Sequence, residues 1–179
     1  MRKILRRALA IELTAVTIVQ PMAGYPSIAK AADDNASISI NGYQISSTLE
    51  GFRTIYSIKD DDKEASEVGL IYGLTDRISE SDMVVGSQNQ YVTVAKATDE
   101  GKNPFKLSDD ANTTSYTMTM LYGDSGTGML SSKISVRAYA KLNNGKYVYS
   151  DIKTMSIYSV ANVLYQQKKM ITYLSLIHI

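Results

Sequence analysis

The stretch that most constrains the fold covers residues 133–152 (KISVRAYAKLNNGKYVYSDI). Its first half alternates apolar and polar residues, the period-two pattern of a strand with one buried face. Asn144-Gly145 is the strongest short hairpin signal, because both central residues of a type I′ turn need a positive φ. A two-residue turn there pairs Ala140 with Tyr149, so the tyrosines of the second strand are expected to face the core. We therefore expect a fold built on this antiparallel hairpin.

The same alternation separates the two faces of the first strand. Its core positions are Ile134, Val136, Ala138, Ala140 and Leu142. Arg137, Tyr139 and Lys141 lie between them and are expected to face outward.

Further strand patterns lie between turn signals along the chain, and helical patterns do not alternate with them. They cover Ser37–Ile40, Tyr43–Ser46, Gly51–Lys59, Glu67–Leu74, Tyr91–Thr98 and Ser115–Tyr122. The first two are either a hairpin or one strand with a bulge at Asn41-Gly42. Residues 99–113 show no period and are expected to be a loop. The sequence predicts an all-β antiparallel sandwich, with a barrel as the alternative.

One helix is predicted near the C-terminus, over residues 156–169. Ile157, Val160 and Leu164 recur at helical spacing behind Ser156, which suits an N-cap. A single helical turn is also possible after Ser79, because an acidic residue follows it at the capping-box spacing.

Residues 1–31 have the pattern of a secretory signal peptide. Four basic residues precede a mostly apolar run, and Ala29-Lys30-Ala31 matches the small-x-small cleavage pattern. The alternatives are an amphipathic first helix and a retained membrane anchor, although Glu12 interrupts the run and shortens it for a span. We expect export, with a mature chain that begins at or near Ala32.

Composition limits the partners and the chemistry. Of the 19 basic and 18 acidic residues, residues 1–31 hold five and one, so the remainder carries 14 basic and 17 acidic groups. A mildly acidic domain lacks the basic patch that nucleic acid requires. The chain has no cysteine and one histidine, so no disulfide and no zinc site is expected.

Two segments resemble a known family. SEVGLIYG (66–73) and ISVRAYAKLNNGKYVYSD (134–151) are similar to the third, sixth and seventh strands of fibronectin type III and immunoglobulin-like modules of secreted, Gram-positive-type bacterial proteins. The resemblance covers about residues 37–152 and implies a sandwich, to which we assign residues 32–155. Ile134 stands where the family often has a tyrosine whose hydroxyl fixes the neighbouring corner. Such modules host many functions, so the resemblance leaves the function open.

The last six residues, 174–179 (LSLIHI), are encoded by a string similar to a transposon end used as a sequencing-library adapter. The alternative is a natural apolar C-terminus. We expect an adapter artefact, which leaves a helical segment over 156–173 and a natural chain that continues beyond Tyr173. His178, the one histidine, then lies outside the natural protein.

Two motifs suggest chemistry only superficially. Gly123-Asp124-Ser125-Gly126 matches the nucleophile segment of trypsin-like proteases. A serine nucleophile needs a base, however, and the one histidine, His178, lies in the expected adapter tail. We expect a glycine-rich turn there. The acidic pairs and triplets of residues 60–62 and 109–110, with Asp124, could offer oxygens to calcium, yet no spacing matches a calcium loop. Solvated loops are the preferred interpretation.

These observations predict a secreted or cell-surface module without catalytic activity, metal or cofactor. The expected ligand is an extracellular polysaccharide or another cell-surface polymer, bound by Tyr139 with Arg137 and Lys141 beside it. The alternative for Tyr139 is that it covers Gly69 of the neighbouring strand and shields the backbone. Two other functions stay open, namely a spacer or docking domain beside a further domain, and a hydrolase whose site lies beyond Tyr173. Neither nucleic acid nor, after cleavage, a membrane is an expected partner.

Overall fold

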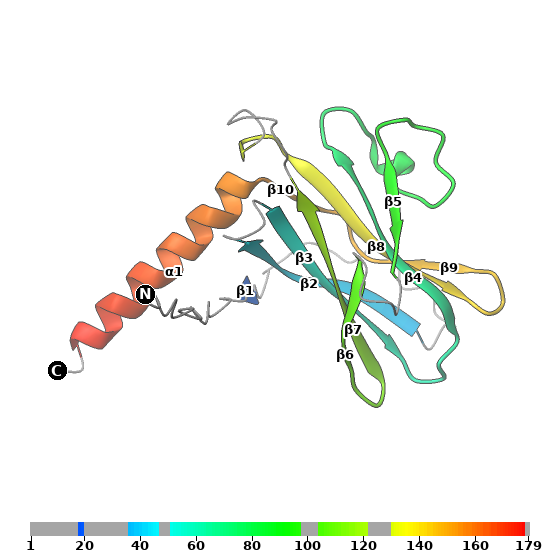
Figure 1. Cartoon of the computed structure of the whole chain (residues 1–179), viewed down its shortest axis with the longest axis horizontal. Helices are drawn as coiled ribbons and strands as arrows, with labels where there is room; N and C mark the ends of the chain where they lie inside the picture. The colour runs from blue at the N-terminus through cyan, green and yellow to red at the C-terminus, as the bar shows by residue number, and fades with distance from the viewer. Residues whose placement is uncertain (1–17, 20–35, 47–50, 98–103, 122–129, 178–179) are drawn as a thin grey trace, which may run out of the picture.

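The computed structural model describes residues 18–19, 36–46, 51–97, 104–121 and 130–177. Ten strands, one 3-10 turn and one α-helix lie within these ranges (Figure 1). They are β1 Ile18–Val19, β2 Ala36–Ser46, β3 Gly51–Asp60, β4 Ala65–Leu74, η1 Glu80–Asp82, β5 Thr93–Lys96, β6 Phe105–Asp109, β7 Thr113–Leu121, β8 Ile134–Leu142, β9 Tyr147–Tyr149, β10 Lys153–Met155 and α1 Ile157–Ile177.

The strands form two sheets in which every pair is antiparallel. The first sheet has the order β1-β2-β3-β7-β6, and the second has the order β10-β8-β4-β5, with β9 also paired to β8. Since β4 occupies one edge of β8, β9 and β10 follow each other along its opposite edge. The prediction of an all-β, antiparallel protein with a C-terminal helix is confirmed.

One apolar core receives side chains from both sheets. Phe52, Tyr56 and Met118 come from the first sheet, and Leu70 and Val136 come from the second. Each strand contributes alternate residues, as the period-two pattern predicts. The two sheets are therefore held together by one shared hydrophobic cluster.

The β8–β9 hairpin forms, but its turn is one residue longer than predicted. Leu142 N donates to Lys146 O at 2.8 Å, and Gly145 has φ +84°. The only described non-glycine residue with a positive φ is Lys63, so Asn144 lacks the φ that a type I′ turn needs. The loop is thus residues 143–145, with the glycine in the left-handed region.

This extra loop residue changes which face the tyrosines occupy. Tyr149 pairs with Tyr139, and Tyr147 pairs with Lys141. The predicted pairing of Ala140 with Tyr149 is wrong by one residue. A slip of one residue moves every side chain to the opposite face. The two tyrosines of β9 consequently lie on the outer face of the second sheet.

Other segments differ from the predictions in smaller ways. The two patterns around Asn41-Gly42 form the single strand β2, with a register shift between Ile40 and Gly42, so the bulge alternative is correct. Residues 105–109, predicted as loop, form β6 because β7 offers them a free edge. Tertiary pairing here overrides a weak local pattern.

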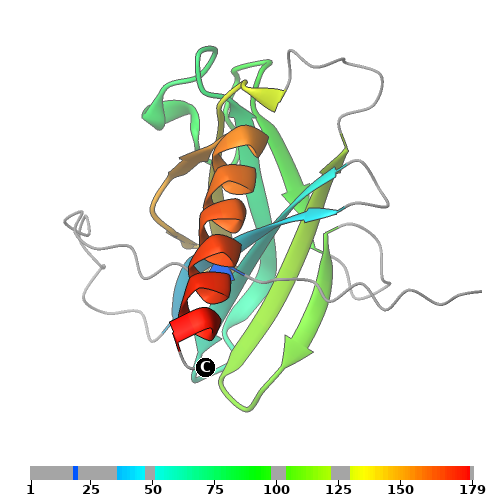
Figure 2. The same ribbon diagram turned by 90° about the vertical axis from the view of Figure 1, so that its left-hand side faces the viewer.

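The helix α1 starts where the sequence predicts, behind Ser156. The Ser156 hydroxyl accepts a hydrogen bond from Ser159 N at 3.1 Å, which satisfies one unpaired donor of the first turn. Val160 is buried against the shared core, and Val163 and Leu164 pack beside it. Figure 1 shows the later turns of the helix running away from the sheets, and in Figure 2 the helix lies in front of them. No helix among the described residues is long and apolar enough to cross a membrane.

Candidate functional site

The outer face of β8 and β9 carries the predicted site residues and is the candidate site. We call it the tyrosine face, defined by Arg137, Tyr139 and Lys141 of β8 and by Tyr147 and Tyr149 of β9. The alternation of β8 correctly predicts that its three residues lie on one face, opposite the shared core. Their exposure differs from the prediction.

Tyr139 is completely buried, which contradicts the expectation of an exposed ring. It forms a second hydrophobic cluster with Ile71 and Met83. The connection between β4 and β5, residues 75–92, supplies Met83 and three flanking apolar residues, Ile78, Val85 and Val92. This connection folds over the outer face of the sheet and removes Tyr139 from solvent. A ring without exposed surface cannot stack on a ligand in this arrangement.

The alternative interpretation of Tyr139, a cover for glycine, agrees with the geometry. A Cβ placed on Gly69 would lie 2.5 Å from Tyr139 Cε1 and 2.5 Å from the Ala95 carbonyl oxygen. Such distances are impossible for a real side chain, so only glycine lets the ring and the β5 backbone approach this closely. Tyr139 therefore packs directly on the β4 backbone.

The Tyr139 hydroxyl is part of a polar chain across three strands. It donates to Glu67 Oε1 at 2.8 Å, and Lys96 Nζ donates to Glu67 Oε2 at 2.8 Å. The Lys96 hydrogen bond is the main cause that lowers the pKa of Glu67, and the Tyr139 bond lowers it further. Burial raises the pKa of Tyr139 well above its ordinary value, so its hydroxyl stays a donor. These hydrogen bonds through Glu67 join β8, β4 and β5.

Arg137 is held by the same covering segment. Its guanidinium donates to Met83 O at 3.1 Å and to Ser150 O at 3.0 Å. It also lies over the Tyr149 ring, 4.5 Å from the centroid. These contacts position Arg137 beneath the tyrosine face, where it supports the Tyr149 ring.

The exposed aromatic ring of this face is Tyr147, which the sequence analysis assigned to the core. Tyr147 is 36% exposed, and its ring stacks beside Tyr149 with centroids 6.0 Å apart and planes 22° apart. Lys141 Nζ lies 5.8 Å from the Tyr147 centroid, a cation–π distance. Asn143 was the signal that could have identified this arrangement, because Asn-Asn-Gly also suits a three-residue loop that ends in a left-handed glycine.

Two of the acidic residues discussed for calcium, Asp60 and Asp109, have structural hydrogen bonds. Asp60 accepts from Glu64 N at 3.0 Å and from Ala65 N at 2.7 Å, which closes the turn between β3 and β4. Asp109 accepts from the Thr114 hydroxyl at 2.8 Å. Within the described ranges, no three His, Cys, Asp or Glu side chains gather as a metal site. Residues 122–129, with the GDSG motif, and His178 lie outside the described residues.

Comparisons of the chain with protein-family models, with curated proteins and with solved structures find no match.

Proposed function

We propose that the chain is an exported, non-catalytic β-sandwich module of the immunoglobulin or fibronectin type III kind that binds carbohydrate or another cell-surface polymer. The strand order supports the fold assignment. The strands β2-β3-β7-β6 and β5-β4-β8-β9 follow the order of the A-B-E-D and C′-C-F-G sheets of that family. In this assignment β4, β8 and β9 are strands C, F and G, and these are the strands that carry the resemblance.

The observation that carries the binding proposal is the stacked pair Tyr147–Tyr149 on the tyrosine face. Sugar rings bind to flat aromatic faces with polar groups at their edges, and Tyr147 offers such a ring with Lys141 next to it. Arg137 and residues 75–92, the segment that covers Tyr139, hold this tyrosine pair in position. A rigid aromatic surface loses little entropy on binding, which favours affinity.

Export and the absence of catalysis rest on the sequence. Residues 1–31 carry the leader pattern, and the absence of cysteine suits a folded domain that gains its stability from its core. With one histidine in the whole chain, acid–base catalysis would depend on carboxylates, Lys or Tyr. We expect the purified protein to hydrolyse no ester, peptide or glycoside.

A polymer-binding assay tests the proposal. The full chain is screened on a glycan array and by co-sedimentation with peptidoglycan, chitin and xylan. We expect retention on at least one polymer, and we expect Tyr147→Ala to weaken it by about 1–3 kcal/mol, the scale of ring stacking on bases. Tyr158→Ala is the matched control, because Tyr158 is an exposed tyrosine on α1. Equal binding by the wild type and Tyr147→Ala contradicts the proposal.

A second candidate function is a spacer or docking domain, favoured by α1. Val160, Val163 and Leu164 of its first two turns pack on the core, and the backbone of the later turns projects from the sheets (Figure 1). Tyr158 and Tyr165 are exposed on it. If this is the function, the polymer screen gives no hit and Tyr147→Ala leaves every assay unchanged.

A further inference from the structure

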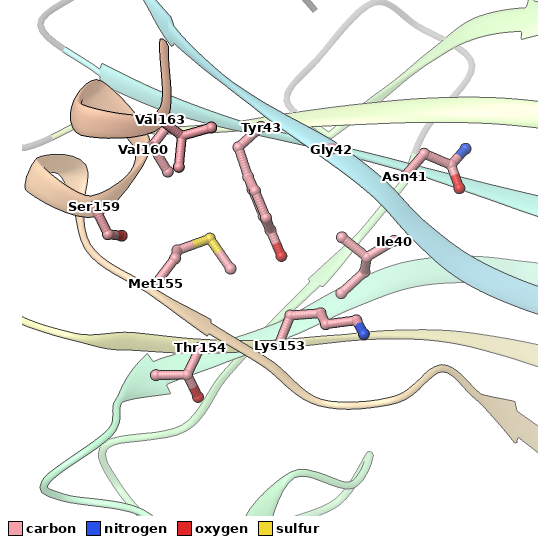
Figure 3. Close-up of a pocket in the computed structure, with 10 residues that line it drawn as sticks. All are labelled: Ile40, Asn41, Gly42, Tyr43, Lys153, Thr154, Met155, Ser159, Val160 and Val163. Carbon is pink, nitrogen blue, oxygen red and sulfur yellow. The ribbon is translucent and has the colours of Figure 1, made fainter. Parts of the chain in front are cut away.

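A hollow of about 280 Å³ lies between the two sheets and the start of α1 (Figure 3). Residues 40–43 of β2, residues 153–155 of β10 and the first two turns of α1 form its walls. Met155, Val160 and Val163 make much of the lining apolar. None of these residues belongs to the tyrosine face, so the hollow is a separate place on the molecule.

Tyr43 contributes an unsatisfied donor to this hollow. The side chain is 9% exposed, and its ring stacks on Phe52 with centroids 5.4 Å apart. Its hydroxyl is buried and has no hydrogen-bond partner among the described residues. Figure 3 shows the hydroxyl pointing from β2 into the hollow, toward Lys153. A buried hydroxyl without a partner is costly, so an acceptor bound here would relieve that cost.

The other neutral polar side chains of the wall already have partners. The Asn41 amide donates to Ser57 Oγ at 2.7 Å. The Ser159 hydroxyl donates to the Ser156 carbonyl oxygen at 2.7 Å. Thr154 Oγ1 is likewise within 3.1 Å of the Ser135 hydroxyl. Among the described residues, the polar groups of the wall without a protein partner are therefore the Tyr43 hydroxyl and one ammonium.

That ammonium belongs to Lys153, the charged residue of the lining. Within the described part of the chain, Lys153 has no ion-pair or hydrogen-bond partner. Burial also raises the pKa of the Tyr43 phenol well above its ordinary value, which keeps the hydroxyl protonated at neutral pH. One neutral donor and one cation beside apolar walls match a single negative charge on an apolar molecule.

We propose that this hollow binds a small apolar carboxylic acid, with the carboxylate between the Tyr43 hydroxyl and the Lys153 ammonium. The apolar body lies against Met155, Val160 and Val163. One lysine balances one carboxylate, whereas a phosphate group would bring more charge than the wall neutralises. The volume is slightly below the usual range for drug-sized ligands, which suits a short aliphatic chain or one aromatic ring.

Calorimetric titration of the full chain tests the proposal with three probes of equal chain length, octanoate, octanol and octylamine. We expect saturable binding with octanoate strongest and octylamine weakest, since only octanoate complements Lys153. Phenylpropanoate, an aromatic acid, shows whether a ring fits as well as a chain. No saturable binding of either acid at about millimolar concentration overturns the proposal.

Three variants locate the binding. Tyr43→Phe keeps the ring and removes only the hydroxyl, and we expect octanoate to bind about tenfold more weakly. Lys153→Met keeps the apolar stem, and we expect it to lose the preference for octanoate over octanol. Val163→Trp fills the hollow and should abolish binding of all probes. Lys133→Met, an exposed lysine elsewhere, is the control and should bind octanoate as the wild type does.

The variants also give the contrary result. Circular dichroism first establishes that each variant is folded, and Tyr43→Phe is expected to fold at least as well because it buries one fewer unpaired group. Wild-type affinity in both Tyr43→Phe and Lys153→Met, or in folded Val163→Trp, places octanoate elsewhere and overturns the proposal.

Discussion

Two buried tyrosines differ in what their hydroxyls contact. The Tyr56 hydroxyl is buried with no hydrogen-bond partner among the described residues, although its ring stacks on Tyr116 at 5.6 Å. The Tyr139 hydroxyl donates to Glu67 at 2.8 Å. The same chemical group thus opposes folding at one position and supports it at the other, because an unmade buried hydrogen bond retains its desolvation cost.

This difference predicts opposite signs for the same substitution. Tyr56→Phe is expected to raise the free energy of unfolding by about 1 kcal/mol, and Tyr139→Phe is expected to lower it by about 1 kcal/mol. Urea denaturation followed by circular dichroism measures both. A loss of stability in Tyr56→Phe would show that its hydroxyl has a partner.

At the scale of elements, the β8–β9 turn decides the composition of a whole face. Gly145 has φ +84°, a conformation that glycine adopts without cost and that asparagine tolerates better than alanine. Gly145→Ala is expected to lower the free energy of unfolding by about 1 kcal/mol, and Gly145→Asn by clearly less. Thermal and urea unfolding of the two variants check this order. Equal losses would contradict the left-handed conformation.

A second prediction at the scale of elements concerns how stability depends on pH through Glu67, which links Tyr139 of β8 to Lys96 of β5. The pKa of Glu67 is below its ordinary 4.5, first because of Lys96 and then because of Tyr139. A carboxylate with a lowered folded pKa stabilises the protein above the unfolded value, and this contribution disappears as pH falls through the folded pKa. We expect Glu67→Gln to lose less stability than the wild type between about pH 7 and about pH 3.

The exposed Asp76 provides the control for this measurement. Its carboxylate lies 3.8 Å from Arg77, and both side chains are more than half exposed, so the pair contributes little. Asp76→Asn should follow the wild-type pH profile. A Glu67→Gln profile identical to the wild type would remove Glu67 from the acid response.

For the whole molecule, we predict that residues 1–31 add little to the stability of the folded domain. Their described residues, Ile18 and Val19 of β1, pair with Tyr43 and Gly42 of β2. The described residues of the shared core all come from β2 onward. A chain that starts at Ala32 is therefore expected to have a free energy of unfolding within about 1 kcal/mol of the full chain.

Two measurements check this whole-molecule prediction. Intact mass of the exported protein should show a chain that begins at or near Ala32, and urea unfolding compares residues 32–179 with the full chain. A mass that still includes Met1, or a loss of several kcal/mol on truncation, would make residues 1–31 part of the mature fold.

The sequence by itself determined most of the strands, the two faces of β8 and the start of the helix. The alternation of β8 identifies its core residues, and Ser156 marks the start of α1, because both signals are local and periodic. The tertiary structure alone decided the burial of Tyr139 and the exposure of Tyr147. The first depends on residues 75–92 folding over the sheet, and the second on one extra loop residue at Asn143. Alternation distinguishes the two faces of a strand, but what covers each face is set by distant segments and by register.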